Sequence, residues 1–413
     1  MGADCAGGRP VMEMAMDGSD RATAITQQSP AQAYAGPPDH RSGVRHAAYP
    51  SLGHDEVERY NYLTQLNHHL AARVLPDVET TWQRRIEPRF EAEHGRKPKD
   101  RHEARKALLA DPVFQTWSAL KRMTMEQRQE AGRWASIRQA ESLAATAAAL
   151  TAAERLTLDP SLPIPRYVSA VDHHCMPGSY HAELFAGDVS GPASYDSGIH
   201  VTVGGRGGPL NDGIGRSLAE WVCQTLPDFK PRRILDLGTT TGHNLLPVAR
   251  AFPDADVVGV DVGAPVLRYA AARAGALGAT NVRFIQADAS NLDRFEDGSF
   301  DFVMTTMFLH ELSLAALDDI LRESHRLIAD GGLMLNMEQP AYKGMPAFEQ
   351  AMRDWDAFYN NEPFWTTLHG LDLEERFGAA GFARDRLIHA TFRDPPDPTG
   401  AAKISMVFVG ARK

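Results

Sequence analysis

Residues 232–261 constrain the fold of this chain more than any other stretch. An apolar strand ends at Asp236, and a turn with glycines at Gly238 and Gly242 follows it. An amphipathic helix comes next, and then a second apolar strand that ends at Asp261. This order predicts the opening half of a βαβ unit, in which the backbone approaches a nucleoside at the glycines and the later carboxylate binds ribose hydroxyls.

Four later segments follow in the order that an open α/β sheet requires. They are a strand that ends at Asp288, a strand at 299–304 that leads into His310, a strand at 333–336 and a last strand at 404–411. Together with the acidic residue before the first glycine, this order resembles the class I S-adenosylmethionine-dependent methyltransferases. The resemblance implies an α/β fold with a Rossmann-like, seven-stranded, mostly parallel sheet whose last strand is antiparallel.

The resemblance also implies S-adenosylmethionine as the cofactor and S-adenosylhomocysteine as the product. Asp236 would lie near the methionine end, Asp261 on the ribose and Asp288 beside the adenine. The residues expected to bind the cofactor are Asp236, Gly238, Thr239, Gly242, Asn244, Asp261, Val262, Asp288, Ala289 and Met307. Thr240 stands where the family usually has a glycine, and a β-branched residue is strained at positive φ. We therefore expect Thr240 to keep ordinary backbone angles.

Methyl transfer is a displacement at a sulfonium carbon, so the protein must mainly align the acceptor and exclude water. An acceptor that carries a proton also needs a base, which belongs at the carboxyl ends of the parallel strands. His310, after the fourth strand, is the first candidate, and Glu338, after the fifth strand, is the next. Glu311 would orient His310 or cap the following helix. A structural hydrogen bond is the alternative role for His310.

An aromatic-rich insertion at 342–365 follows the fifth strand. The resemblance implies that such an insertion helps to form the acceptor pocket, and its aromatic density suits a planar or apolar acceptor. Asp356, Tyr359 and Asn360 would orient that acceptor, and Tyr359 is a third catalytic candidate. Alternatively, the aromatic residues at helical spacing pack the insertion onto the sheet.

The N-terminal half has a different composition. Residues 1–54 are rich in Gly, Ala, Pro, Ser and Gln and predict a disordered leader. Apolar residues at helical spacing over 55–157 predict an all-helical domain, with helices at 102–109, 113–125 and 127–150 among others. The basic residues of this domain predict a solvated face or, alternatively, a docking surface for an acidic carrier protein.

Residues 158–214 connect this domain to the methyltransferase domain at 215–413 and contain several potential metal ligands. His173, His174 and His181 are good ligands for zinc, iron or manganese, but their spacing matches no standard metal motif. Histidines in a loop more often bond to backbone or face solvent. We therefore expect no metal, with these three histidines as the candidates if one binds. We favour a lid that covers the substrate.

The chain has 413 residues and a net charge of −10, which argues against nucleic acid as a partner. It has no stretch as long as a membrane span and no secretory signal, and its three cysteines are typical of a reducing cytoplasm. We expect a cytoplasmic methyltransferase of a small molecule or carrier-bound intermediate, in specialised metabolism by analogy. The alternatives are a protein or peptide methyltransferase and a non-catalytic cofactor-binding scaffold. The oligomeric state has no sequence signal.

Overall fold

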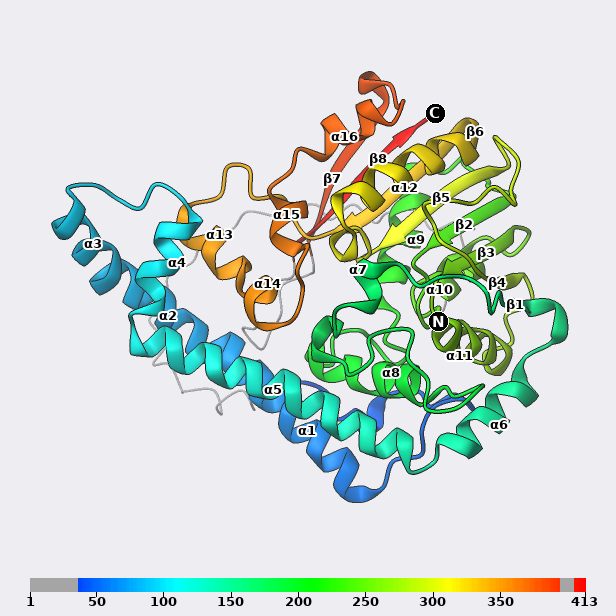
Figure 1. The fold of residues 1–413 in the computed structure, drawn as a ribbon, viewed down its shortest axis with the longest axis horizontal. Helices are drawn as coiled ribbons and strands as arrows, with labels where there is room; N and C mark the ends of the chain where they lie inside the picture. The colour runs from blue at the N-terminus through cyan, green and yellow to red at the C-terminus, as the bar shows by residue number, and fades with distance from the viewer. Residues whose placement is uncertain (1–35, 394–404) are drawn as a thin grey trace, which may run out of the picture.

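The computed structural model describes residues 36–393 and 405–413, whose strands form one eight-stranded sheet. Figure 1 shows helices around this sheet and a helical arm that extends away from it. The strands are β1 (Leu156–Thr157), β2 (Arg233–Leu237), β3 (Asp256–Asp261), β4 (Val282–Gln286), β5 (Phe300–Thr306), β6 (Ile328–Glu338), β7 (Leu387–Arg393) and β8 (Ser405–Arg412).

The strand order is β1-β4-β3-β2-β5-β6-β8-β7, with parallel pairing from β1 to β6. Strand β8 is antiparallel to both β6 and β7, so the mostly parallel sheet with an antiparallel last strand is confirmed. The sheet has one strand more than expected, because Leu156 and Thr157 pair with β4 at its edge. Strands β3 and β4 are added on one side of β2, and β5 and β6 on the other side. Ligands bind where the strand order reverses in this way, so a ligand site is expected at the carboxyl ends of β2 and β5.

The central strands are buried on both faces, as near-continuous apolar sequences require. Leu235 and Val303 belong to one core, and Ile234 and Phe302 belong to the other. Several helices contribute to these two cores, among them α9 (Gly213–Thr225), α10 (Leu245–Ala251), α11 (Ala264–Ala276), α12 (Leu314–Leu327) and α16 (Leu373–Ala379).

The helical arm of Figure 1 consists of α1 (His54–His69), η2 (Leu70–Val74), α2 (Leu75–Thr81), η3 (Trp82–Ile86), α3 (Glu87–His94), α4 (Arg101–Leu109) and α5 (Pro112–Ile137), while α6 (Ala140–Leu150) packs against α11. The predicted boundary between helices at residue 126 is wrong, since α5 continues to Ile137. No glycine or proline interrupts the helix there, and the break falls instead at Gln139, whose φ is −129° and ψ 20°.

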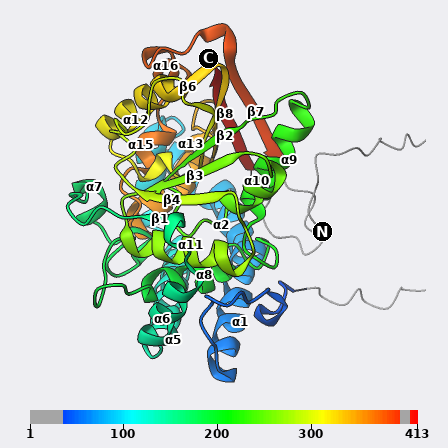
Figure 2. The same cartoon turned by 90° about the vertical axis from the view of Figure 1, so that its right-hand side faces the viewer.

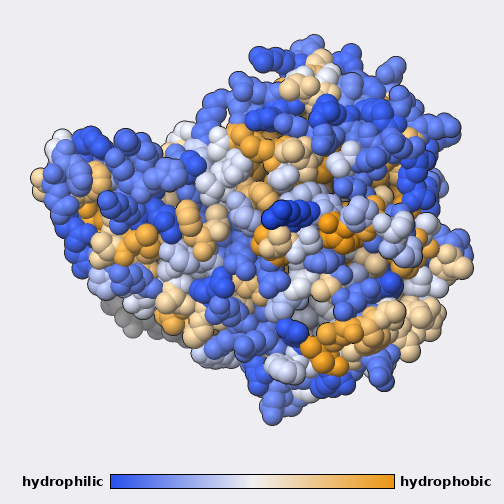
Figure 3. All heavy atoms as spheres, viewed as in Figure 1, coloured by the Kyte–Doolittle hydropathy of each residue, from blue (hydrophilic) through white to orange (hydrophobic). Residues whose placement is uncertain are grey.

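No helix in the described part of the chain combines the length and the apolar character that a membrane crossing requires. On the face that Figure 3 shows, the surface is largely hydrophilic and the apolar residues form separate small patches.

The connecting segment 158–214 is more ordered than a simple loop. It contains α7 (Arg166–Ser169), η5 (His173–Cys175) and α8 (Ser190–Thr202). Helix α8 packs against α5 and α1 on one side and against α11 on the other, and Figures 1 and 2 both show it beside α11. It therefore joins the helical arm to the sheet.

The prediction of a disordered leader is wrong for residues 36–54, which pack against α1 and α8; residues 1–35 lie outside the described residues. The His40 ring stacks on Tyr60 at 4.6 Å between centroids, and its Nε2 lies 3.2 Å from the Ser197 carbonyl. Histidines carry this packing, so the scarcity of large aliphatic residues gave no sign of it.

The carboxylate of Asp196 on α8 joins three parts of the chain in the buried interior. It accepts hydrogen bonds from Arg273 Nη1 at 2.7 Å and Tyr269 Oη at 2.8 Å, both on α11, and lies 3.0 Å from His46 Nε2. Burial opposes its ionisation, but Arg273, His46 and Tyr269 outweigh burial and hold the pKa of Asp196 well below its usual range.

We predict that Asp196→Asn lowers the free energy of unfolding by about 3 to 5 kcal/mol, because it leaves the buried Arg273 guanidinium without its counter-charge. The midpoint and slope of urea unfolding measure this change. Asp256→Asn is the control, because it breaks only exposed ion pairs with Arg283 and Arg233 and should cost less than about 1 kcal/mol. Equal losses in the two variants would show that Asp196 has no special part in the fold.

Candidate active site

A cavity of about 200 Å³, partly open to solvent, lies at the carboxyl ends of the parallel strands. One side is formed by the residues that follow β2, β3, β4 and β5. The opposite side is formed by η5 and by residues of α8 and α5, among them Tyr195, Ile199 and Arg128. The cavity therefore lies between the sheet and the helices that α8 attaches to it.

The turn after β2 brings its backbone close to the cavity. Gly238 and Gly242 have φ of +71° and +70°, and a Cβ on Gly238 would lie 2.2 Å from the Phe308 ring. The expectation for Thr240 is wrong, since its φ is +48°. Its N–H donates to Asp261 Oδ2 at 3.0 Å and its hydroxyl donates to the Gly238 carbonyl at 3.2 Å. These two bonds hold a β-branched residue in a conformation that its side chain disfavours.

Two carboxylates flank this turn. Asp261 faces the cavity and accepts from the backbone N–H groups of Thr240 and Gly263, and burial raises its pKa to about 6 in spite of these bonds. Asp236 is 2% exposed, its Oδ1 has no hydrogen-bond partner, and burial raises its pKa to about 7. An unpartnered buried carboxylate oxygen and a carboxylate on the cavity fit a cofactor with a cationic end and a ribose.

Seven residues of the expected cofactor site line the cavity, namely Gly238, Thr239, Asn244, Asp261, Val262, Ala289 and Met307. Asp236 and Gly242 do not line it. Asp288 does not line it either, because its carboxylate accepts from the backbone N–H and hydroxyl of Ser290 at 2.9 and 2.7 Å. Asn244 fixes the turn against β5 by donating to Thr306 Oγ1 at 3.0 Å.

His310 lies in η6 (Leu309–Glu311), after β5, and lines the cavity while being only 2% exposed. Its Nδ1 is 2.9 Å from Glu338 Oε2, and Glu338 Oε1 accepts from the Leu309 N–H at 2.7 Å. Burial opposes the charge, but Glu338 raises the pKa of His310 to about 9. A protonated imidazole has no free lone pair, so this environment favours hydrogen-bond donation at Nε2 over proton abstraction. Glu338 does not line the cavity and orients His310.

Tyr359, the third catalytic candidate, is not brought to the cavity. It ends α14 (Trp355–Tyr359), its ring packs on Trp355, and its hydroxyl accepts from Arg105 Nη2 at 3.3 Å. The insertion also contains α13 (Ala347–Arg353) and α15 (Trp365–His369). Its Phe348, Trp355 and Tyr359 pack in the core of the helical arm, where Trp355 Nε1 donates to Ser118 Oγ at 2.8 Å.

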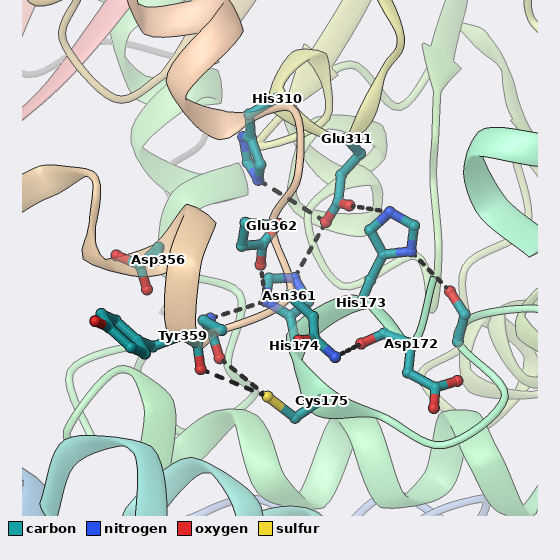
Figure 4. Close-up of polar contacts among 12 residues, drawn as sticks. Asp172, His173, His174, Cys175, His310, Glu311, Asp356, Tyr359, Asn361 and Glu362 are labelled. Carbon is teal, nitrogen blue, oxygen red and sulfur yellow. Dashed lines mark hydrogen bonds and ion pairs between the residues drawn. The ribbon is translucent and has the colours of Figure 1, made fainter. Parts of the chain in front are cut away.

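Glu311 lies at the centre of a group of imidazoles at the other end of the cavity (Figure 4). Its Oε1 is 3.1 Å from His174 Nε2 and 3.9 Å from His310 Nε2, and its Oε2 is 3.3 Å from His173 Nε2. Tyr180 donates its hydroxyl to the same carboxylate at 3.1 Å. Burial opposes ionisation, but the histidines lower the pKa of Glu311 to about 2.

Glu362, to which the sequence analysis gave no role, completes this group from the insertion. It is 1% exposed and lies against His174 Nδ1. Burial and the Glu311 charge raise its pKa to about 7. We call His173, His174, His310, Glu311 and Glu362 the histidine–glutamate cluster. His181 joins neither this cluster nor the lining of the cavity.

Arg128 on α5 also lines the cavity and was not singled out from the sequence. It is 3% exposed, and its Nε donates to the Gly198 carbonyl at 3.0 Å. Burial lowers its pKa. No carboxylate of residues 36–391 or 406–413 lies within ion-pair distance of it. A buried guanidinium without a counter-charge is costly, and the cavity is where an anion could meet it.

The comparisons with known proteins agree with this geometry. Residues 234–332 match the family model of a methyltransferase domain. Demethylmenaquinone methyltransferase of Thermus thermophilus is 41% identical over 110 residues, which are 27% of this chain and 48% of that protein. Malonyl-[acyl-carrier protein] O-methyltransferase of Geobacter sulfurreducens is 32% identical over 40% of this chain and 57% of that protein.

Trans-aconitate 2-methyltransferase of Deinococcus radiodurans is 31% identical over 44% of this chain and 62% of that protein. The chain therefore spans between 48% and 62% of the length of these three relatives. The matched segment includes the glycine turn and the strands whose carboxyl ends form the cavity. The C-terminal half of this chain is a class I S-adenosylmethionine-dependent methyltransferase domain.

Proposed function

We propose that the protein transfers the methyl group of S-adenosylmethionine to a small-molecule or carrier-bound acceptor that carries an anionic group. The observation that supports this most is that one cavity is lined by the glycine turn, by His173, His174, His310 and Glu311 of the histidine–glutamate cluster, and by Arg128. Cofactor residues, polar groups for the accepting atom and a cation for recognition thus share one cavity.

At the cofactor end, Asp261 would accept hydrogen bonds from the ribose hydroxyls, and the Gly238 backbone would lie against the cofactor. Asp236 would supply negative charge behind the turn. When bound, S-adenosylmethionine supplies an electrophilic methyl group on a sulfonium. The remaining task of the protein is to align the acceptor and keep water out.

At the acceptor end, His310 would hold the accepting atom by a hydrogen bond at Nε2, and Glu338 would hold the imidazole in position through Nδ1. Tyr180 and Glu311 present further polar groups beside it. Tyr195 and Ile199 of α8 cover the cavity from the helical side and would exclude water.

Arg128 favours an anionic acceptor over a neutral one. Its guanidinium is buried and lines the cavity, so a carboxylate or phosphate of the acceptor could pair with it. Two of the relatives are named for malonyl-[acyl-carrier protein] and trans-aconitate, which are acceptors of this kind. A peptide side chain and a purely structural role have no comparable support.

We predict that Asp261→Asn weakens S-adenosylhomocysteine binding roughly 10- to 100-fold, because hydrogen bonds to a charged group contribute about 1.5 to 3 kcal/mol. Calorimetric titration measures the affinity. Asp288→Asn is the matched control and should stay within about threefold of the unchanged protein, since its carboxylate is occupied by Ser290.

The same titration has a defined pH dependence. The raised pKa of Asp261 leaves its carboxyl protonated at low pH, so the affinity of the unchanged protein should rise as pH increases through 6. In Asp261→Asn the rise in affinity near pH 6 should disappear, and only the pH dependence that Asp236 contributes near pH 7 should remain. Similar losses for the Asp261 and Asp288 variants, or no loss for either, would disprove the assignment of Asp261.

We predict that the protein transfers a labelled methyl group from S-adenosylmethionine to a member of a panel of small carboxylic acids, phosphate esters and acyl-carrier-protein thioesters. His310→Gln should reduce turnover roughly 100-fold while cofactor affinity is unchanged, because its hydrogen bond positions the acceptor. Undiminished transfer by this variant would rule out the role of His310. Cofactor binding without transfer to any compound would favour the scaffold alternative.

We predict that Arg128→Met raises KM for an anionic acceptor roughly 10- to 100-fold and leaves kcat and the KM of its neutral ester nearly unchanged. The thermal stability of the variant should be equal or higher, because an unpaired buried charge has been removed. Arg133→Met on the same helix is the control, since Arg133 is exposed and lies outside this cavity. Equal effects on the acid and its ester would refute recognition of an anion by Arg128.

A further inference from the structure

Several potential ligand atoms of the histidine–glutamate cluster make no hydrogen bond. His174, Glu311 and Glu362 each offer one ring nitrogen or carboxylate oxygen, and these atoms all lie within 4.8 Å of one another. Four buried atoms of the cluster make no hydrogen bond, namely His173 Nε2, Glu311 Oε2 and both oxygens of Glu362. Three of them are held in ion pairs within the cluster, whereas Glu362 Oε2 has neither a hydrogen bond nor an ion pair among the described residues. Buried polar atoms in proteins are nearly always bonded, so this oxygen calls for a partner that the described residues do not provide.

Three separate segments are held together at this point, as Figure 4 shows. His174 comes from η5, Glu311 from η6 and Glu362 from the loop after α14. Asn361 Nδ2 donates to the Asp172 carbonyl at 3.0 Å, and Cys175 Sγ lies 3.9 Å from the Tyr359 carbonyl. These contacts fix the loops of His174 and Glu362 against each other, so the potential ligands converge before any ion binds.

We propose that His174, Glu311 and Glu362 bind one divalent transition-metal ion, of the zinc, iron(II) or manganese(II) type, with His173 as a fourth ligand. Imidazole together with carboxylates is a donor set that these ions accept. Two ligand atoms on one such ion are about 3 to 3.5 Å apart. Glu311 Oε1 lies 3.1 Å from His174 Nε2, and Glu311 Oε2 lies 3.3 Å from His173 Nε2. An imidazole binds one ion through one nitrogen, so an ion at His174 Nε2 would leave Nδ1 to its contact with Glu362 Oε1 and would use Glu362 Oε2 as the ligand.

The surroundings of His173 agree with a role as ligand. Its Nδ1 lies 3.0 Å from Ser179 Oγ, and this contact orients the ring so that Nε2 points to Glu311. Ligand histidines commonly use their second nitrogen in this way, and the partner fixes the ring before the ion arrives.

The proposed ion would lie at the acceptor end of the cavity, which His174 and Glu311 line and Glu362 does not. There it could draw an oxygen or nitrogen of the acceptor toward His310. This role of the ion rests on the proposed function, whereas binding of the ion does not. The site itself can therefore be tested without knowing the acceptor.

The test uses the full-length protein after removal of metals with a chelator and titration with Co²⁺, followed by visible absorption and calorimetry. One equivalent should bind with an absorption band typical of nitrogen and oxygen ligands. Glu362→Gln and His174→Gln should each weaken binding by more than the roughly 10- to 100-fold that follows loss of a group that only orients a ligand. His181→Gln, in the same segment but outside the cluster, should bind Co²⁺ like the unchanged protein.

The side-chain hydrogen bonds of the glycine turn do not involve His174, Glu362 or His181. S-adenosylhomocysteine affinity should therefore be the same in every variant, and measuring it shows whether each variant is folded. Glu362→Gln keeps the size of the side chain and removes a buried acid, so it should fold. Absence of Co²⁺ binding in the unchanged protein, or equal affinities in the Glu362, His174 and His181 variants, would overturn the metal site. The cofactor titration would then still decide the proposed function separately.

Discussion

The buried carboxylate of Asp196 is the interaction on which both sides of the cavity depend. It fixes α8 to α11 through Arg273 and Tyr269. Helix α11 begins three residues after Asp261, and Tyr195, next to Asp196, lines the cavity from the opposite side. One carboxylate therefore sets the spacing between the cofactor side and the helical side. A buried ion pair recovers little net energy after desolvation, and its value here is that it allows one arrangement of the two layers.

Buried charged groups of both signs lie in and around the cavity. Arg128 lines the helical side, Glu311 lines the cavity after β5 among its histidines, and Glu362 lies behind His174. Each such group lowers the stability of the folded chain, and a sequence selected for stability alone would have replaced it with an apolar residue. Their position around one cavity indicates that they meet ligands there.

The sheet and the glycine turn could be predicted because their signals are local. Alternating turns and apolar strands, and acidic residues at strand ends, are read from neighbouring positions. Glu362 and Arg128 could not be found in this way, because their partners lie in distant segments and no spacing rule links them. Thr240 shows the opposite failure: a sound local rule for β-branched residues is overruled by its two hydrogen bonds, to Asp261 and to Gly238. The order of residues 36–54 depends on histidine contacts, which composition does not reveal.

The same structure changes what the aromatic insertion implies about the acceptor. Its aromatic density suggested a planar or apolar acceptor, but Trp355 and Tyr359 pack in the core of the helical arm. What the insertion gives to the site is Glu362, a carboxylate in contact with His174. An apolar molecule in this cavity would bury the Arg128 guanidinium without pairing it and would cost more than it gains from contact. The acceptor that we propose is therefore polar and anionic, with its charge at Arg128 and its accepting atom near His310.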